Sequence, residues 1–221
     1  MSKEKMFILT TENAKEVTGV HYTTKHTGKM TGMQSLSTSC LNNPYCKTYA
    51  QDPAKVCSHC YAQRQMKMYT SMQECLKQNT EILTNKFLSY DEIPLINASM
   101  FRFESFGDIQ NITQVINYFN ICYKNPMVDF ALWTKNPSIV NQALLAGYEK
   151  PKNVQIVLSS HYLNVVADIS EFSFIDKVFT VFDKNYIKEH EIDINCGSKS
   201  CLLCGICYRK NEIVYINEKL K

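Results

Sequence analysis

Ten cysteines lie along this 221-residue chain in a pattern that few folds accommodate. Eight of them form two groups: Cys40, Cys46, Cys57 and Cys60 near the N-terminus, and Cys196, Cys201, Cys204 and Cys207 near the C-terminus. No apolar run near the N-terminus is long enough for a secretory signal, so we expect a cytoplasmic protein whose thiols stay reduced. Reduced cysteines at CxxC spacing typically bind metals, so we expect a metal-binding segment towards each end of the chain.

The second cysteine group contains the most specific motif, Cys201-Leu-Leu-Cys204-Gly-Ile-Cys207. Consecutive CxxC steps let one short loop present three thiolates to a compact centre, as ferredoxin-type proteins do for a [4Fe–4S] cluster. Zinc sites usually pair two separate CxxC knuckles instead. The spacing therefore favours an iron–sulfur cluster, with Cys196 as the nearest fourth ligand and zinc as the alternative metal.

The first cysteine group is less regularly spaced, and it lies in a stretch rich in turn-forming residues such as Asn42, Asn43 and Pro44. Four thiolates suffice for one site, so this group holds either a second cluster or a structural metal that staples the N-terminal loop. Cys75 and Cys122 stand apart from both groups, on or beside helical stripes. We expect these two to be buried as small hydrophobic residues.

Strands alternate with helices through the middle of the sequence. Strand-forming runs begin near Met100, Val128, Val154 and Val178. Helical patterns separate the first three of these runs, and Asn136 and Pro137 suit the cap and the first turn of the second helix. This alternation predicts an α/β protein whose parallel βαβ units form a partial (βα) barrel or an open sheet.

We expect a single α/β domain over residues 1–221. It would comprise an N-terminal cysteine loop region (1–60), a helix and βα core (61–190), and a C-terminal cysteine cluster and tail (191–221) with a short strand near 213–216. A long amphipathic helix is expected from Tyr61 to about Phe87, because apolar residues recur there at helical spacing without Pro or Gly. No apolar run reaches the roughly 18 residues of a membrane-spanning helix, so we expect no membrane partner.

Polar side chains follow the ends of the predicted strands, where the active sites of parallel α/β proteins form. The candidate catalytic residues are Glu104, Asp108, Lys135 and His161, and the candidate cofactor contacts are Ser105 and Ser160. Strand alternation predicts that Arg102 and Glu104 share one face of the sheet. Polar residues are common at strand ends, so the combination indicates a pocket more strongly than any one residue does. We expect both cysteine groups to reach this rim of the sheet.

Three short stretches follow one another in an order shared with a known family. They are SLSTSCLNNPYC with CSHCYAQ within residues 35–63, FRFESFGDI at 101–109 with FALWTKNPSIV at 130–140, and CGSKSCLLCGICYRK at 196–210. In this order they resemble the phage-associated gene product 88 family. The resemblance implies a mobile-element origin and the cytoplasm of a bacterial host, but no particular reaction.

A more distant similarity is to radical S-adenosylmethionine enzymes of the spore-photoproduct-lyase type. These enzymes have a partial βα barrel and a cluster loop that ends in Cys-Tyr before a helix, as Cys60 and Tyr61 do here. Cys46 lies too far from Cys57 for the CxxxCxxC spacing that is common in them. The similarity implies one or two [4Fe–4S] clusters, with S-adenosylmethionine as a further cofactor.

Three functions are open at this point. The first is an iron–sulfur-dependent enzyme that acts on nucleic acid or nucleotide, and the second is a metal-stapled binding or redox-sensing protein without catalysis. The third follows from a similarity to tRNA-guanine transglycosylase barrels, which implies zinc at the late cysteines and Asp108 or Asp183 as the nucleophile. A net charge of +3 is too small to argue for nucleic-acid binding by itself.

Overall fold

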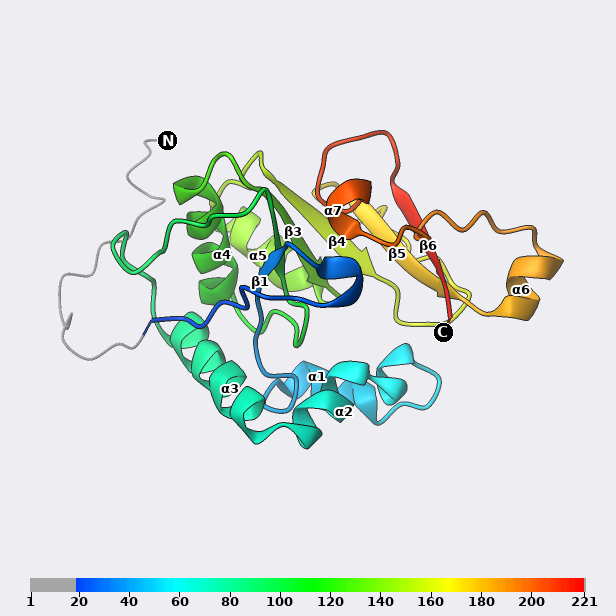
Figure 1. The fold of residues 1–221 in the computed structure, drawn as a ribbon, viewed down its shortest axis with the longest axis horizontal. Coiled ribbons are helices and arrows are strands. Elements are labelled where there is room, and N and C mark those ends of the chain that lie inside the picture. Colours follow the sequence, from blue (N-terminus) through cyan, green and yellow to red (C-terminus); the bar gives the residue numbers. More distant parts are fainter. Residues whose placement is uncertain (1–18, 221) are drawn as a thin grey trace.

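The computed structural model describes residues 19–220, and its centre is a six-stranded parallel sheet (Figure 1). The strands are β1 (Gln34–Leu36), β2 (Met100–Phe103), β3 (Asp129–Thr134), β4 (Val154–Ser159), β5 (Lys177–Phe182) and β6 (Tyr215–Lys219). They lie side by side in the order of the sequence, as in a (βα) barrel, but β1 and β6 do not pair. The predicted parallel α/β fold is confirmed, and its sheet is open rather than closed.

The four strands predicted in the middle of the chain occur where the strand-forming runs begin. The tail strand predicted near 213–216 is displaced to β6. The strand begins later than predicted because the residues just before β6 bind the ammonium group of Lys177 and do not continue the ladder with β5. Nζ of Lys177 donates to the carbonyl of Ile213 at 2.5 Å and to Oδ1 of Asn211 at 2.6 Å.

Three helices cover one face of the sheet: α3 (Thr70–Asn85), α4 (Ile112–Lys124) and α5 (Pro137–Leu145). Alternate residues of β2 and β3 point into this layer and are fully buried: Phe101, Phe103, Phe130 and Leu132. Pro137 begins α5 as expected, but the side chain of Asn136 caps no backbone N–H, contrary to the prediction. It accepts a hydrogen bond from the Ser138 hydroxyl instead.

The helix predicted from Tyr61 to about Phe87 is two helices, α2 (Tyr61–Met68) and α3, with Tyr69 extended between them. The break lets the two apolar stripes face different surroundings. Met66 on α2 and Leu76 near the start of α3 pack against the N-terminal cysteine loop, whereas Leu83 later in α3 joins the main core.

The opposite face of the sheet is covered by short chain segments. Met100, Ala131 and Val157 on this face pack against Met33 and Tyr208. Two short helices lie here and contact each other: η2 (Gly28–Met30), just before β1, and α7 (Cys201–Cys204), before β6 (Figure 1). The C-terminal cysteine segment therefore forms part of a second layer over the sheet.

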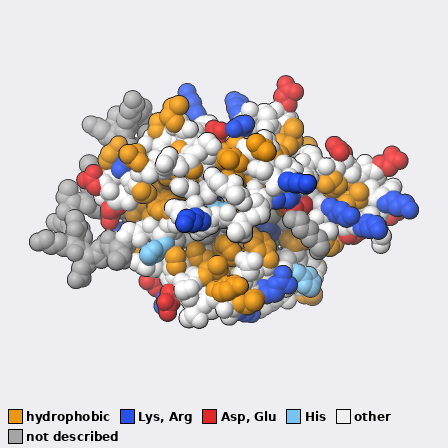
Figure 2. All heavy atoms as spheres, in the orientation of Figure 1, with side chains coloured by type: hydrophobic (Ala, Val, Ile, Leu, Met, Phe, Trp, Pro, Cys, Tyr) orange, Lys and Arg blue, Asp and Glu red, His pale blue; other side chains and the backbone are white. Residues whose placement is uncertain are grey.

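The remaining helices are α1 (Pro44–Ala50) and η3 (Val56–His59) in the N-terminal cysteine loop, and α6 (Lys184–Glu189) after β5. In Figure 2, hydrophobic side chains gather on the lower part of the visible surface, where Figure 1 places α1 to α3. The exposed hydrophobic residues of α2 and of its junction with α3 are Tyr61, Met68 and Tyr69. Within the described residues, no helix is long and apolar enough to cross a membrane.

Candidate metal centres and strand-end site

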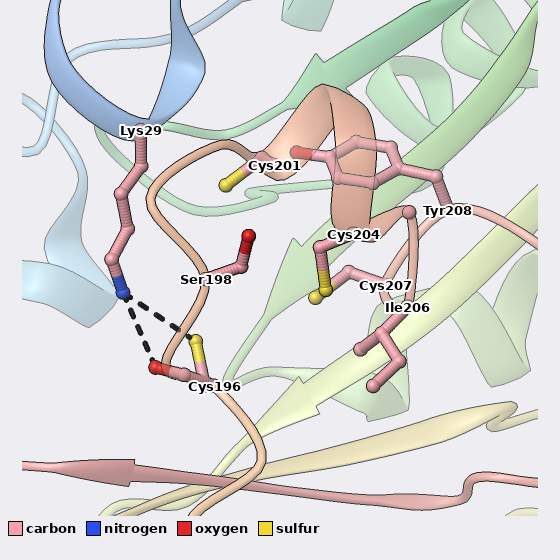
Figure 3. A pocket seen from close by; sticks show the side chains of 9 residues that line it. Lys29, Cys196, Ser198, Cys201, Cys204, Ile206, Cys207 and Tyr208 are labelled. Carbon is pink, nitrogen blue, oxygen red and sulfur yellow. Dashed lines mark hydrogen bonds between the residues drawn. The ribbon is translucent and has the colours of Figure 1, made fainter.

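The four cysteines of the C-terminal group line one small, partly open pocket. The first two cysteines of the CxxCxxC motif lie on α7. Gly205, in the left-handed region at φ 64°, ends this helix and turns the chain so that Cys207 also borders the pocket. Cys196 is placed by its own N–H, which donates to the Asn217 carbonyl on β6 at 3.0 Å. Figure 3 shows the four sulfur atoms around the same space.

Two cations lie close to these thiols. Nζ of Lys29 is 3.3 Å from the carbonyl oxygen of Cys196 and 3.9 Å from its Sγ. Burial raises the pKa of Cys201 and of Cys207, the latter to about 12, and the guanidinium of Arg102 opposes both shifts. Burial thus disfavours free thiolates here, whereas a bound metal ion would stabilise them.

Within residues 19–220, no three or more Cys, His, Asp or Glu side chains are grouped closely enough to hold a metal ion. The predicted metal-binding segments are therefore not confirmed. The donor set of the C-terminal pocket does fit a metal, because four thiols border one space and soft sulfur ligands select zinc or iron–sulfur clusters. α7 is only four residues long and lies between irregular segments.

The N-terminal cysteines lie beyond the carboxyl end of β1. Cys46 is on α1, Cys57 is on η3, and Cys60 stands between η3 and α2. Cys40 is 1% exposed, with its thiol 3.3 Å from Sδ of Met66. The neighbouring Cys40 thiol, together with N–H groups at the start of α2, lowers the pKa of Cys60. Cys60 is therefore the thiol of this group that most readily becomes a thiolate.

Asp108 ties the carboxyl ends of β2 and β3 together. Its buried carboxylate accepts hydrogen bonds from the N–H groups of Ile109 and Lys135, both at 2.8 Å, and from the Thr134 hydroxyl at 2.5 Å. The Asn43 side chain donates to its backbone carbonyl at 2.8 Å, which joins the N-terminal cysteine loop to the same point. Burial raises the pKa of Asp108. The residue thus holds strand ends in place.

Glu104 does not share a face with Arg102, contrary to the expectation from strand alternation. Its φ of 58° turns the chain just after β2, and burial raises its pKa to about 8. Its carboxylate enters the helix layer and accepts hydrogen bonds from Thr38, Gln114 and Tyr118. Arg102 lies on the other face, with the centre of its guanidinium 4.2 Å from the centroid of the Trp133 ring.

Lys135 and His161 lie beside the N-terminal cysteines. The Tyr45 hydroxyl donates to the Lys135 carbonyl at 2.6 Å and lies 2.7 Å from Nε2 of His161. Because that carbonyl takes the only hydroxyl hydrogen, Nε2 of His161 carries the hydrogen that it donates to Tyr45. Burial is the largest cause that lowers the pKa of His161, and the ammonium groups of Lys135 and Lys55 lower it further, to about 4. The imidazole is therefore neutral at pH 7, with Nδ1 as an acceptor.

An aromatic stack continues from this histidine. The Tyr45 and Tyr49 rings on α1 stack with centroids 4.2 Å apart, and the Tyr49 ring is 4.8 Å from the His161 ring. Nζ of Lys55 lies 3.9 Å from the centroid of the Tyr49 ring. Sequence reasoning passed over these tyrosines, although their four-residue spacing on a short helix was a readable signal.

The two cysteine groups occupy different places, so the expectation that both reach one rim of the sheet is wrong. The N-terminal group lies near Lys135, whose ammonium opposes the rise that burial causes in the pKa of Cys57. The C-terminal group lies over the face of the sheet opposite the helix layer, where Cys201 and Cys207 pack. Arg209, just after the motif, pairs with Asp129 at the start of β3, with Nε 3.5 Å from Oδ2. One group thus lies at the strand ends and the other over the sheet.

Comparison with known proteins gives one result. The family model described as "Gene product 88" matches residues 7–214. The chain belongs to the gene product 88 family. No curated protein and no solved structure matches it. The resemblance seen in the sequence is thus confirmed, and the similarity to radical S-adenosylmethionine enzymes stays a prediction.

In this gene product 88 protein, the predicted strand-end residues fall into two sets. Lys135 and His161 lie with the N-terminal cysteines, whereas Glu104 and Asp108 are buried acceptors that hold the fold. Ser160 donates to the Val165 carbonyl, and the buried hydroxyl of Ser105 has no hydrogen-bond partner among the described residues. Asp183 caps α6 through the N–H groups of residues 185 and 186. Both carboxylates named as possible nucleophiles, Asp108 and Asp183, thus accept hydrogen bonds within the fold, and a nucleophilic role for either stays a prediction.

Proposed function

We propose that this member of the gene product 88 family is an iron–sulfur-dependent enzyme with two thiolate-bound centres. The observation that carries the proposal is the C-terminal pocket, where four cysteines and one lysine border a single space. Thiolate donors favour zinc or iron–sulfur clusters over metals that prefer oxygen ligands. Consecutive CxxC steps favour a [4Fe–4S] cluster over zinc.

The reactive centre in this proposal is the N-terminal group. Cys46, Cys57 and Cys60 are half-buried, whereas Cys40 is buried against Met66, which leaves three thiols for a cluster. Three protein ligands would leave one iron of a [4Fe–4S] cluster open to a small molecule, and S-adenosylmethionine is the proposed occupant. When bound, such a cluster would supply one-electron chemistry.

The proposed substrate is a nucleotide or a nucleic acid. The stacked rings of Tyr45 and Tyr49 offer an aromatic surface, on which bases of any sequence can stack. Lys55 and Lys135 both act on His161 through their charge, and they supply positive charge for a phosphate group. Neutral His161 supplies an acceptor nitrogen in the same place. These residues bind and orient the substrate.

A second candidate is a metal-stapled binding or redox-sensing protein without catalysis. The C-terminal pocket favours it, because four thiols around one space are the ligand set of a closed structural site. In that case the buried Cys40 would also serve as a ligand and close the N-terminal centre. The two functions therefore differ in whether the N-terminal centre keeps an open coordination position.

Equilibrium binding tests the substrate class. The full-length, metal-loaded protein is titrated with ATP and with a single-stranded oligonucleotide, and compared with Lys135→Met and with Lys210→Met, an exposed control of the same charge change. Losing a charge-assisted hydrogen bond of about 1.5–3 kcal/mol should weaken binding about 10- to 100-fold in the first variant only. Equal affinity in both variants, or no binding by the unaltered protein, overturns the proposed substrate class.

A further inference from the structure

Lys29 approaches the C-terminal cysteines from the other end of the chain. It lies on η2, 167 positions before Cys196, and its ammonium group donates to the Cys196 carbonyl and lies 3.9 Å from that sulfur. The same ammonium group pairs with Oε1 of Glu218 on β6 at 3.1 Å. It is a cation on the wall of the pocket, and Figure 3 shows it directed towards Cys196.

The position of Lys29 matters because β1 and β6 are the two edge strands of the open sheet. η2 immediately precedes β1, whereas Cys196 and Glu218 belong to the segment that leads into β6 and to β6 itself. η2 and α7 are also closely packed, because a Cβ on Gly32 would lie 3.2 Å from Cδ2 of Leu202. The cysteine pocket thus lies between the two edges, with Lys29 across it.

Charge gives Lys29 a role at a metal centre. Four thiolates around a divalent metal, or around a cluster core of charge +2, carry a net charge of −2. Lys29 and Arg102 are cations whose charge favours the thiolate forms of these cysteines. The carboxylate of Glu218 has the opposite effect, and it is paired with Lys29. A lysine that donates to a ligating sulfur stabilises such a centre and fixes the ligand's position.

We infer that Lys29 is a positioning residue for a metal centre of Cys196, Cys201, Cys204 and Cys207, and that it holds the two edge strands of the sheet together when that centre is loaded. The inference rests on the proposed metal site, but not on the proposed reaction. The inference assigns a role to the segment before β1, for which the sequence alone indicated none. It also predicts that metal loading at the C-terminus stiffens the chain around residue 29.

Metal release tests this inference directly. The full-length protein is loaded with Zn²⁺ without oxygen, and its metal is competed away with a chromophoric chelator. Loss of an outer hydrogen-bond partner typically weakens a metal site 10- to 100-fold, so Lys29→Met should lower the affinity of one class of site by that factor. Lys29→Arg should largely restore it, and Lys210→Met should leave it unchanged. Glu218→Gln should cost less than Lys29→Met, because Lys29 still reaches Cys196.

Two further readouts separate the possible failures. If Cys204→Ser binds as much metal as the unaltered protein, the C-terminal metal site itself is wrong. If Cys204→Ser loses one metal but Lys29→Met keeps full affinity, the site stands and the role of Lys29 is wrong. In the iron-loaded protein, Lys29→Met should shift the reduction potential of one centre to a more negative value, because a nearby cation stabilises the reduced state. An unchanged potential would also overturn the role of Lys29.

Discussion

The backbone N–H of Lys135 donates a 2.8 Å hydrogen bond to Oδ2 of Asp108, a residue of the preceding βα unit. This bond fixes the point where β3 ends, and therefore the position from which the Lys135 side chain reaches Ser159 Oγ at 2.7 Å. Asp108 is thus connected to the candidate site through Lys135. This hydrogen bond leads to a specific prediction for Asp108, and the raised pKa of Glu104 leads to one for the second buried carboxyl group.

Asp108→Asn should destabilise the protein by about 1–3 kcal/mol, because an amide nitrogen would face the Lys135 N–H and leave a buried donor unsatisfied. Relief of the buried charge acts in the opposite direction, but the carboxylate has three hydrogen-bond donors to compensate for its burial. Urea unfolding measures the change. Asp91→Asn, on an exposed side chain, is the control. Equal stability of the two variants would contradict the structural role of Asp108.

Glu104 should make the protein less stable as the pH rises. Its pKa is raised to about 8 in the folded state, so the folded form keeps a proton that the unfolded form has already lost. Stability is therefore lost between the ordinary carboxyl range and about pH 8, by at most about 1.4 kcal/mol per pH unit. The difference in unfolding free energy between the unaltered protein and Glu104→Gln, measured from pH 6.5 to 8, isolates this contribution from those of other groups, such as Cys60, that titrate in the same range. Glu104→Gln should reduce the slope, and an identical slope would refute the assignment.

His161 should stay neutral until the pH falls to about 4. Its folded-state pKa lies below its ordinary value, so the stability that it contributes is present above pH 6.5 and is lost as the pH falls towards 4. Proton NMR of the imidazole gives the titration directly. Lys135→Met should move the pKa upward, because the nearby ammonium group lowers it in the unaltered protein. A downward shift or no shift would place Lys135 away from His161.

Cys204→Ser should lower metal content and thermal stability together. The Cys204 side chain is exposed, so the substitution removes little packing and its effect on stability reports the metal. A loss of about 2 kcal/mol would lower Tm by about 4–8 °C in a protein of this size. Cys75→Ser, on a half-buried cysteine outside both groups, is the control and should keep its metal. The reverse result would mean that the ligands are assigned to the wrong cysteines.

The sequence predicted the parts of the fold that local pattern determines. The strand-forming runs near Met100, Val128, Val154 and Val178 became β2 to β5, because long apolar stretches bounded by turn residues have few alternatives. β1 was not predicted, since three residues with two polar side chains carry no strand signal. The break at Tyr69 was missed for a similar reason, because no Gly or Pro marks it.

The errors at the candidate site come from backbone geometry and from long-range contacts. A positive φ at a non-glycine residue is rare, so alternation placed Glu104 on the wrong face. The approach of Lys29 to Cys196 depends on how both sheet edges are covered, which local pattern does not encode. The grouping of Lys135 with His161 was predictable, because parallel strands bring their carboxyl ends to one edge.

The central claim is that the two cysteine groups hold iron–sulfur centres. Iron and acid-labile sulfide analysis of the full-length protein, purified without oxygen, tests it most directly. The account predicts iron and sulfide in about equal amounts, as a [4Fe–4S] core requires, and loss of roughly half of both in Cys204→Ser. Stoichiometric zinc without iron, or a folded protein that contains neither metal, would contradict it.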